Sequence, residues 1–475
     1  MSELMLALEK EAVNRQHDVA NIIASGASSV EKFYSGTNVF VTGGSGFLGK
    51  QLLEKLFRCC NVNKVYLLLR AKKGKTAQQR VKEILQDPVF DSLHNRKSKF
   101  ADNVLAVSGD VSEVKLGLSA SDWELITGQV NIIFHTAATV NFNESMKVVA
   151  LTNVRGTREI LRSIVHVSTA YSHATHSRVG RAVKEQFYDS PVPPNAFIDM
   201  AETIDESKLE NMMQQVKADW PNAYSFSKAL GEEIVRSEAE NLPISIVRPA
   251  IVISSYREPL PGWIDPMNSL GPSGLILGLM TGIIHVLRTR QNIVLSLVPA
   301  DLVTNTTLVA ACETAKAQTN KDNIKIYNIT NNRNPLLWYL SSITPYHKLR
   351  TQVCSGFEFG YCGSRKEQLR FYVPPRSKIM FCVLSGIASR HKVWILLNIY
   401  EKVNKLTSAL DFFINNDWKF QDDNTLSLHK NMSSIDRDIF NCDIATLDRR
   451  ECIKKPTITN WGNNKGILLL HLPSY

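Results

Sequence analysis

Tyr224 and Lys228 are the residues whose spacing most directly suggests chemistry. They stand four positions apart in AYSFSKALGEE, and residues i and i+4 share one face of a helix. A lysine ammonium beside a phenol lowers the cost of forming phenolate, so the pair predicts a tyrosine that moves a proton at neutral pH. Ser168 and Thr169 come earlier, at the tip of a predicted strand, where a hydroxyl can hold a carbonyl oxygen that becomes an alkoxide. We favour Thr169, because Ser168 is expected to end the strand.

A glycine cluster lies between a predicted strand and a predicted helix. The sequence reads NVFVTGGSGFLGK from Asn38 to Lys50, and helical spacing continues over residues 51–58. Glycines permit a sharp turn and a close approach to pyrophosphate, and the N-terminus of a helix offers N–H groups and a positive dipole end. The glycines fit both GxGxxG and TGxxGxxG, and this context predicts dinucleotide binding. The alternative is a β–α turn that binds nothing.

The predicted strand 64–70 bears on the choice of cofactor. Sites that prefer NAD place an acidic residue about 20 residues beyond the glycines, on the ribose 2′-hydroxyl. Here the strand ends at Arg70, followed by Lys72 and Lys73. Cations suit a 2′-phosphate, so we expect NADPH; the alternative is a solvated basic loop. Asp110, after the next strand, could contact the adenine or cap a turn.

Apolar runs alternate with helical spacing along most of the chain. The expected strands are residues 39–42, 64–70, 103–107, 131–136, 164–168, 244–248 and 324–329. Helical spacing is found between them, for example over residues 77–85 and 207–216. This alternation predicts an α/β fold with a doubly wound parallel sheet of the Rossmann type.

The alternation stops near residue 335, which predicts a second, mainly helical domain. The expected divisions are a partly helical lead-in (1–36), a nucleotide-binding domain (37–335), an irregular connector (336–378), a helical C-terminal domain (379–453) and an unstructured tail (454–475). Within the helical domain, the spacing indicates helices over residues 400–413 and 434–447.

Composition limits the classes of partner. The 475 residues carry a net charge of +10 without a long Lys/Arg run, which suits an anionic cofactor, an anionic substrate or a membrane surface and does not demand nucleic acid. The 8 cysteines lack metal-ligand spacing, so we expect reduced thiols and no metal site. We expect ordinary packed or surface histidines at positions 135, 166, 173 and 176.

Two apolar stretches invite a comparison with membrane spans. Residues 275–287 fall short of the roughly 20 residues that a spanning helix needs, and residues 379–399 are interrupted by Arg390, His391 and Lys392. Neither is expected to cross a membrane, and peripheral attachment stays open.

Several motifs together resemble a known family. TGGSGFLG, HTAATVNF, NVRGT, VHVSTAYS and YSFSK resemble the extended short-chain dehydrogenase/reductase superfamily, and within it the fatty acyl-CoA reductases, especially arthropod members. The likeness covers about residues 33–338 and resumes over about 379–452. It implies NADPH-dependent reduction of long-chain acyl-CoA to the primary alcohol with release of CoA, in two successive hydride transfers. It also implies an acyl-substrate subdomain within 37–335 and a place on the cytosolic face of the endoplasmic reticulum or peroxisomal membrane.

The resemblance also assigns roles by position. Tyr224 is implied as proton donor, Lys228 as the residue that orients the nicotinamide ribose, and Thr169 as the group that steadies the oxyanion. The glycine turn would hold the pyrophosphate, residues 137–139 the ribose and nicotinamide, and Pro249 the nicotinamide end. The expected cofactor-binding residues are Thr42, Gly43, Gly46, Phe47, Leu48, Gly49, Arg70, Lys73, Asp110, Val111, Ala137, Ala138, Thr139, Lys228 and Pro249.

The segment from Asn153 to Ser168 is shorter than in related chains. A parallel crossover needs a dozen or more residues, so the sheet can close, with a shortened last helical turn. This departure keeps open a catalytically impaired paralogue that binds NADPH or acyl-CoA without turnover. A reductase or epimerase acting on a sugar nucleotide or a sterol is a further alternative, against which the C-terminal domain counts.

Overall fold

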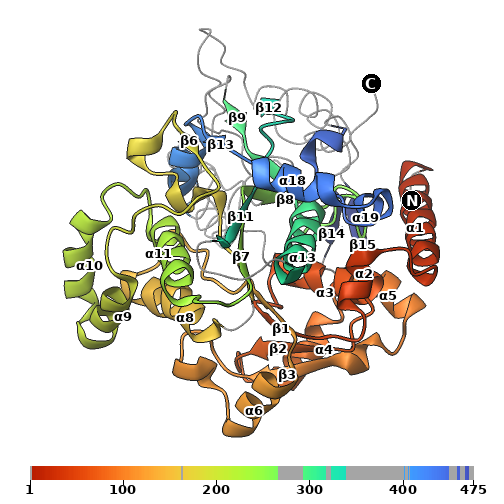
Figure 1. The fold of residues 1–475 in the computed structure, drawn as a ribbon, viewed down its shortest axis with the longest axis horizontal. Coiled ribbons are helices and arrows are strands. Elements are labelled where there is room, and N and C mark those ends of the chain that lie inside the picture. The colour runs from red at the N-terminus through yellow and green to blue at the C-terminus, as the bar shows by residue number, and fades with distance from the viewer. Residues whose placement is uncertain are drawn as a thin grey trace, which may run out of the picture. The chain divides into compact units, whose positions relative to one another are not determined.

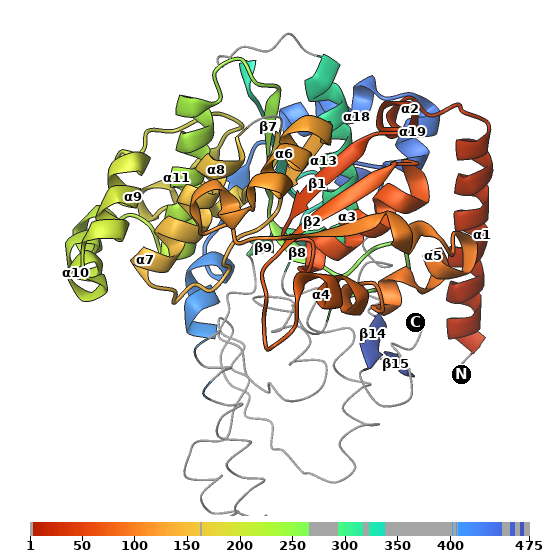
Figure 2. The ribbon, with the colours of Figure 1, turned by 90° about the horizontal axis from the view of Figure 1, so that it is seen from below.

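A parallel sheet of seven strands is the framework of the described structure. The structure is a computed structural model and describes residues 3–161, 164–265, 293–316, 323–337, 401, 405, 407–448, 457–460 and 466–469. The strand order is β11-β7-β5-β4-β1-β2-β3, and every neighbouring pair is parallel. Figure 2 shows β1 and β2 side by side. The bounds are β1 Asn38–Thr42, β2 Lys64–Leu69, β3 Val104–Ser108, β4 Ile132–His135, β5 Ile164–Val167, β7 Ile244–Pro249 and β11 Lys325–Ile329. The Rossmann-type fold is therefore confirmed, with strand ends within one residue of those expected.

Helices cover both faces of the sheet. On one face, Phe40, Ile133 and Ile246 pack with Ile126 of α6 (Ala120–Gln129) and Val235 of α11 (Ala223–Glu238). On the other face, α3 (Phe47–Cys59) and α13 (Ala300–Lys316) contact each other, and α13 contacts β5 and β7. Figure 1 shows α11 and α13 on opposite sides of β7 and β11. Burial on both faces explains why these strands read as continuous apolar runs.

The remaining elements complete this framework. The other helices are α1 Glu3–Ala24, α2 Ser29–Tyr34, α4 Ala77–Ile84, α5 Asp91–Arg96, α7 Met146–Val149, α8 Gly156–Ile160, α9 Pro194–Thr203, α10 Glu206–Val216, α18 Asp423–Asn431 and α19 Ser434–Ile439. Short strands are β6 Ala182–Val183, β8 Ile251–Ile253, β9 Val294–Leu295, β10 Leu297–Pro299, β12 Leu336–Leu337, β13 Lys419–Phe420, β14 Thr457–Asn460 and β15 Gly466–Leu469. A π-helix, η4, spans Ala150–Arg155, and 3₁₀ turns are η1 Pro88–Phe90, η2 Phe100–Asn103, η3 Val114–Gly117, η5 Ala170–His173, η6 His176–Arg178 and η8 Ile444–Thr446.

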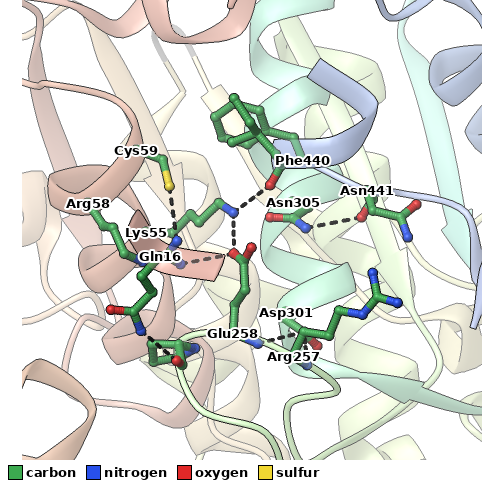
Figure 3. Close-up of polar contacts among 12 residues, drawn as sticks. Gln16, Lys55, Arg58, Cys59, Arg257, Glu258, Asp301, Asn305, Phe440 and Asn441 are labelled. Atoms are coloured by element: carbon green, nitrogen blue, oxygen red, sulfur yellow. Dashed lines mark hydrogen bonds and ion pairs between the residues drawn. The ribbon is translucent and has the colours of Figure 1, made fainter. Parts of the chain in front are cut away.

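Buried charges anchor helix α3, which follows the glycine turn. Lys55 and Arg58 of α3 both pair with Glu258, and the Arg58 guanidinium lies 2.9 Å from the carboxylate. Asp301 of α13 accepts hydrogen bonds from the backbone N–H groups of residues 256–258, at 2.8–3.1 Å. Figure 3 shows the Glu258 carboxylate beside the Lys55 ammonium. The segment that carries Glu258 is thus tied to both α3 and α13.

Contacts divide the chain into two units. The first comprises Met1–Asn268, Ser296–Asn334 and Trp418–Leu469, and the second Ser269–Leu295, Pro335–Asp417 and Leu470–Tyr475. In the first, β13 pairs with β6, and Arg333 bridges Asp422 and Asp443 at 2.9 and 2.5 Å. In the second, β9 pairs with β12, and residues 407–414 are helical. The domain boundaries expected from the sequence stay predictions.

The short crossover between β4 and β5 closes through three helical pieces. It runs through α7, the π-helix η4 and α8, which ends at Ile160; Leu161 then leaves the helix with φ −63° and ψ 100°. β5 nevertheless pairs with β4 and β7 along its length. The parallel sheet therefore closes across this crossover, as expected from its length.

Two expectations for the C-terminal part differ from the structure. Helical spacing over residues 434–447 produces only α19 and the turn η8, because Phe440 departs from helical geometry (φ −120°, ψ 51°) and Asp443 caps η8. The tail expected to be unstructured contains the antiparallel pair β14 and β15. The apolar stretches 275–287 and 379–399 and the irregular region 338–375 lie outside the described residues. Among the residues described, no helix is long and apolar enough to cross a membrane.

Candidate active site

The structure brings Tyr224, Lys228 and Thr169 together. Tyr224 lies in the first turn of α11, whose N-cap Asn222 accepts a hydrogen bond from the backbone of Ser225. Lys228 is buried one turn later. Thr169 follows β5, and its hydroxyl lies beside the Tyr224 phenol. The i, i+4 spacing thus places phenol and ammonium on the face of α11 that meets the end of β5.

Burial sets the protonation of this pair. It raises the pKa of Tyr224 to about 12, against the opposing effect of the hydrogen bond with Thr169. It lowers the pKa of Lys228 to about 8, against the attraction of Glu232. The Lys228 ammonium donates to the backbone carbonyl of Val167 at 2.8 Å. The raised pKa keeps the Tyr224 phenol protonated at neutral pH, which is compatible with the role of proton donor expected from the sequence.

The hydroxyls of Ser168 and Thr169 have different surroundings. Ser168 donates to the carboxylate of Glu232 at 2.5 Å, inside the core. Thr169 donates to the carbonyl of Pro249 at 3.3 Å and accepts from the backbone N–H of Tyr171 at 3.2 Å. Since Thr169 is the one beside Tyr224, the geometry favours it as the group that holds a substrate carbonyl.

The glycine turn has the form that a pyrophosphate requires. Gly43 has a φ of +78°, and a Cβ there would lie 2.6 Å from the backbone nitrogen of Ala137. A Cβ on Gly49 would lie 2.2 Å from the carbonyl oxygen of Gly43. Gly46 is the N-cap of α3 and provides no capping side chain. The helix therefore begins with backbone N–H groups facing a turn that only glycine allows, which fits a bound phosphate.

The neighbours of the turn support it in different ways. The Thr42 hydroxyl is fully buried and contacts His135 Nδ1 at 2.8 Å, so Thr42 holds β1 to β4 and its side chain faces away from solvent. Phe47, in the first turn of α3, packs on Trp263 with ring centroids 5.2 Å apart. Leu48 is partly buried beside it.

The basic residues after β2 lie at the same edge of the sheet. Thr42 is in register with Leu68, so Arg70 emerges close to the glycine turn. Its guanidinium is 60% exposed and lies 3.2 Å from the carboxylate of Asp110. Burial raises the pKa of Asp110, but hydrogen bonds from Ser112 and Arg70 outweigh it and leave the pKa lowered. Lys73 is exposed in a tight turn, with a φ of +53°.

The residues expected near ribose and nicotinamide lie at the ends of β4 and β7. Ala137 and Ala138 are partly buried. Thr139 is held by Asn153, which accepts from its backbone N–H at 2.9 Å and donates to its carbonyl at 3.2 Å. Pro249 ends β7. Val111, another of the expected cofactor-binding residues, lies against α8. A Cβ on Gly156 of that helix would lie 2.9 Å from the carbonyl oxygen of Val111.

Known proteins resemble this chain along most of its length. The family model for the NAD-binding domain of male sterility proteins matches residues 41–307, and the model for their Sterile domain matches residues 379–458. "Fatty acyl-CoA reductase wat" of Drosophila melanogaster is 33% identical over 450 residues, covering 89% of this chain and 83% of that protein. Human fatty acyl-CoA reductase 1 is 34% identical over 449 residues, covering 90% and 84%. The chain belongs to the fatty acyl-CoA reductase family.

A solved structure agrees on the fold of this family member. The terminal reductase domain of the myxalamid biosynthetic pathway aligns with a TM-score of 0.55 and 20% identity, covering 89% of this chain and 93% of that domain. The NAD-binding model and the glycine turn agree on a nicotinamide dinucleotide as the cofactor.

Two residues of this reductase were not singled out from its sequence. Glu232 is a buried acceptor for several side chains around Thr169. Asn153 joins Thr139 to Ser227 of α11, donating to the Ser227 hydroxyl at 2.9 Å. The sequence pointed to Glu232 only through its position four residues after Lys228. Charged residues in a helix are usually exposed, so this spacing alone did not indicate a buried acceptor.

His135 and His166 of this reductase pack against each other in the core. His135 and His166 stack with ring centroids 5.4 Å apart. Burial, with the nearby charge of Lys228, lowers the pKa of both, to about 3 for His135. Within the described residues, no group of three or more His, Cys, Asp or Glu side chains could hold a metal ion. Cys59, Cys60, Cys312 and Cys442 are buried and free.

Proposed function

We propose that this protein reduces long-chain fatty acyl-CoA to the primary fatty alcohol with NADPH, releasing CoA. The proposal rests on one observation: Thr169 lies beside Tyr224, and the Lys228 ammonium is buried one turn further along α11. These residues lie at the edge of the sheet that also carries the glycine turn. The named activity of the relatives supplies the substrate class.

The choice of NADPH rests on Arg70. Its exposed guanidinium stands where β2 leaves the sheet, next to the glycine turn, and a guanidinium binds a phosphate well. The Asp110 carboxylate accepts a hydrogen bond from the Arg70 guanidinium. Lys73 provides a second cation in the turn that follows. The backbone of Gly43, Gly46 and Gly49 would cradle the pyrophosphate.

The proposed mechanism uses Thr169 and Tyr224 to bind the thioester carbonyl. The reduced nicotinamide supplies one hydride to the carbonyl carbon in each of two rounds. In the first round, Thr169 and Tyr224 donate hydrogen bonds to the developing oxyanion, and its collapse breaks the carbon–sulfur bond, releasing CoA as a thiolate that takes up a proton. In the second, Tyr224 gives its proton to the aldehyde oxygen, which completes the alcohol.

Lys228 supports both rounds through its charge. Its ammonium is held under the site by the Val167 carbonyl. A nearby cation favours the phenolate that Tyr224 becomes when it gives up its proton in the second round, and this phenolate then takes a proton from solvent.

The direct test is incubation of purified protein with palmitoyl-CoA and NADPH. We expect two NADPH oxidised for each alcohol formed and one free thiol released. Folded protein that yields neither NADPH oxidation nor alcohol would sink the proposal. An acyl-CoA panel then measures chain-length preference, and NADH in place of NADPH tests the cofactor.

The same assay addresses the competing functions. Tight NADPH binding without turnover would support an impaired paralogue, as would recovery of activity when a longer segment is inserted before Ser163. Competition by a sugar nucleotide rather than acyl-CoA would support a sugar-modifying enzyme. For the location, we propose the cytosolic face of the endoplasmic reticulum or peroxisomal membrane, which cell fractionation with a protease-protection assay would test.

A further inference from the structure

We propose that Glu232 is a positioning residue that holds the Thr169 loop against helix α11. The inference rests on the proposed reductase function for its kinetic test. Glu232 is 1% exposed and accepts five hydrogen bonds from side chains. It touches none of the groups assigned to the substrate, so its effect has to pass through the residues that it holds.

The residues held by Glu232 surround Thr169 in the chain. Ser168, immediately before Thr169, donates to Oε1 at 2.5 Å, and Ser172 donates to the same oxygen at 2.9 Å. His173 donates from Nε2 to Oε2 at 3.1 Å. The loop is therefore fixed on both sides of Thr169 by one carboxylate.

A buried arginine completes the arrangement from the neighbouring strand. Arg248 of β7 donates from Nε to Oε1 at 2.9 Å and from an Nη to Oε2 at 2.5 Å. It also donates to the backbone carbonyls of Lys184 and Gln186, each at 3.0 Å. The guanidinium neutralises Glu232 and leaves oxygen lone pairs for the loop. Buried charges are tolerated when paired and hydrogen-bonded in this way.

Helix geometry links this carboxylate to the reacting groups. Tyr224, Lys228 and Glu232 follow one another at intervals of four on the same face of α11. Glu232 thus joins α11 to the loop on both sides of Thr169, in addition to the bond from Lys228 to the Val167 carbonyl, and so helps to set the distance between the Thr169 hydroxyl and the Tyr224 phenol. A catalytic pair misplaced by about 1 Å loses roughly 100-fold in rate.

Glu232 also influences Lys228. The charged and titratable groups that face Lys228 are His135 of β4, His166 of β5 and Glu232 of its own helix. Both histidines are neutral at physiological pH because burial lowers their pKa, so Glu232 is the charge that favours the ammonium. Removing it should move the alkaline loss of activity to lower pH.

The test compares Glu232→Gln with Glu233→Gln on the full-length protein. Glu233 is the matched control, because it is the neighbouring glutamate and its ion-pair partner is Arg236 of the same helix. We expect Glu232→Gln to lower kcat roughly 10- to 100-fold, with unchanged NADPH affinity and an alkaline limb shifted to lower pH. Glu232→Asp, which keeps the charge but shortens the reach, should lower kcat without moving that limb.

A second measurement does not depend on turnover. Hydrogen exchange of the backbone amides of residues 169–173 should accelerate in Glu232→Gln and stay unchanged in Glu233→Gln. If Glu232→Gln does not fold, Ser172→Ala can replace it, because it removes one of the five hydrogen bonds and leaves Arg248 paired with Glu232. We then expect a smaller loss of kcat and a smaller acceleration of exchange. An unchanged exchange rate with unchanged kcat would overturn the inference. If the wild type itself has no activity, the proposed function fails and the exchange measurement alone decides the role of Glu232.

Discussion

Replacing Gly49 by alanine should weaken cofactor binding more than any other single-methyl change in the glycine turn. The new Cβ would lie 2.2 Å from the Gly43 carbonyl oxygen and 2.7 Å from the Gly44 Cα. The first of these is about 1.2 Å closer than the 3.4 Å at which ordinary contact begins. Both obstacles are backbone atoms, so no side chain can rotate away.

The turn must therefore shift where it approaches the pyrophosphate. The Gly43 carbonyl accepts the N–H of Gly46 at 2.9 Å, and this bond would be strained or lost. Overpacking of this kind costs about 1–3 kcal/mol, which corresponds to roughly 5- to 150-fold weaker NADPH binding when it falls on the bound state.

The assay is titration of NADPH by fluorescence or calorimetry, together with a thermal melt. Gly128→Ala is the control, because a Cβ at that position in α6 meets nothing within 4 Å. We expect the control to bind NADPH like the wild type. Wild-type affinity in a folded Gly49→Ala protein would refute the assignment of this turn to the cofactor.

Four further outcomes are expected. Tyr224→Phe should lower kcat by roughly 10²–10⁴-fold while NADPH affinity, measured by titration, is retained. Because burial lowers the pKa of Lys228 to about 8, its charge is lost as the pH rises through that value, so kcat should fall on the alkaline side, as a pH–rate profile will show. Arg70→Glu should weaken NADPH roughly tenfold relative to NADH, measured as the ratio of the two kcat/KM values. Glu258→Gln leaves the buried Lys55 ammonium without an ion pair and removes one of the two carboxylates that pair with Arg58. It should destabilise the fold by about 3–5 kcal/mol in denaturant titration, whereas Glu83→Gln, at an exposed pair, should cost about 0–1 kcal/mol.

The local patterns in the sequence identified most of the framework. Continuous apolar runs located the strands because both faces of a parallel sheet are buried. The glycine spacing between β1 and α3 predicted the turn, since only glycine fits the backbone at Gly43 and Gly49. The i, i+4 pair on α11 followed from helix geometry alone.

Two other features differ from the prediction, one through a local strand pair and one through a contact between distant segments. The tail expected to be unstructured contains a strand pair, because β14 and β15 satisfy one another's backbone groups. The helix expected to extend to residue 447 ends at Ile439. There, the carbonyl of Ile439 accepts the ammonium of Lys55 at 2.6 Å, a contact between residues far apart in the chain.

The sequence by itself determined the kinds of chemical group and their order: a glycine turn, a cation after β2, a hydroxyl after β5, and a tyrosine with its lysine. These follow from the geometry of short segments. Only the tertiary structure decided which hydroxyl lies beside Tyr224, because the Ser168 hydroxyl donates its hydrogen bond to Glu232 in the core. It also decided that the pKa of Tyr224 is raised, because a pKa depends on burial and on charges that chain folding brings together.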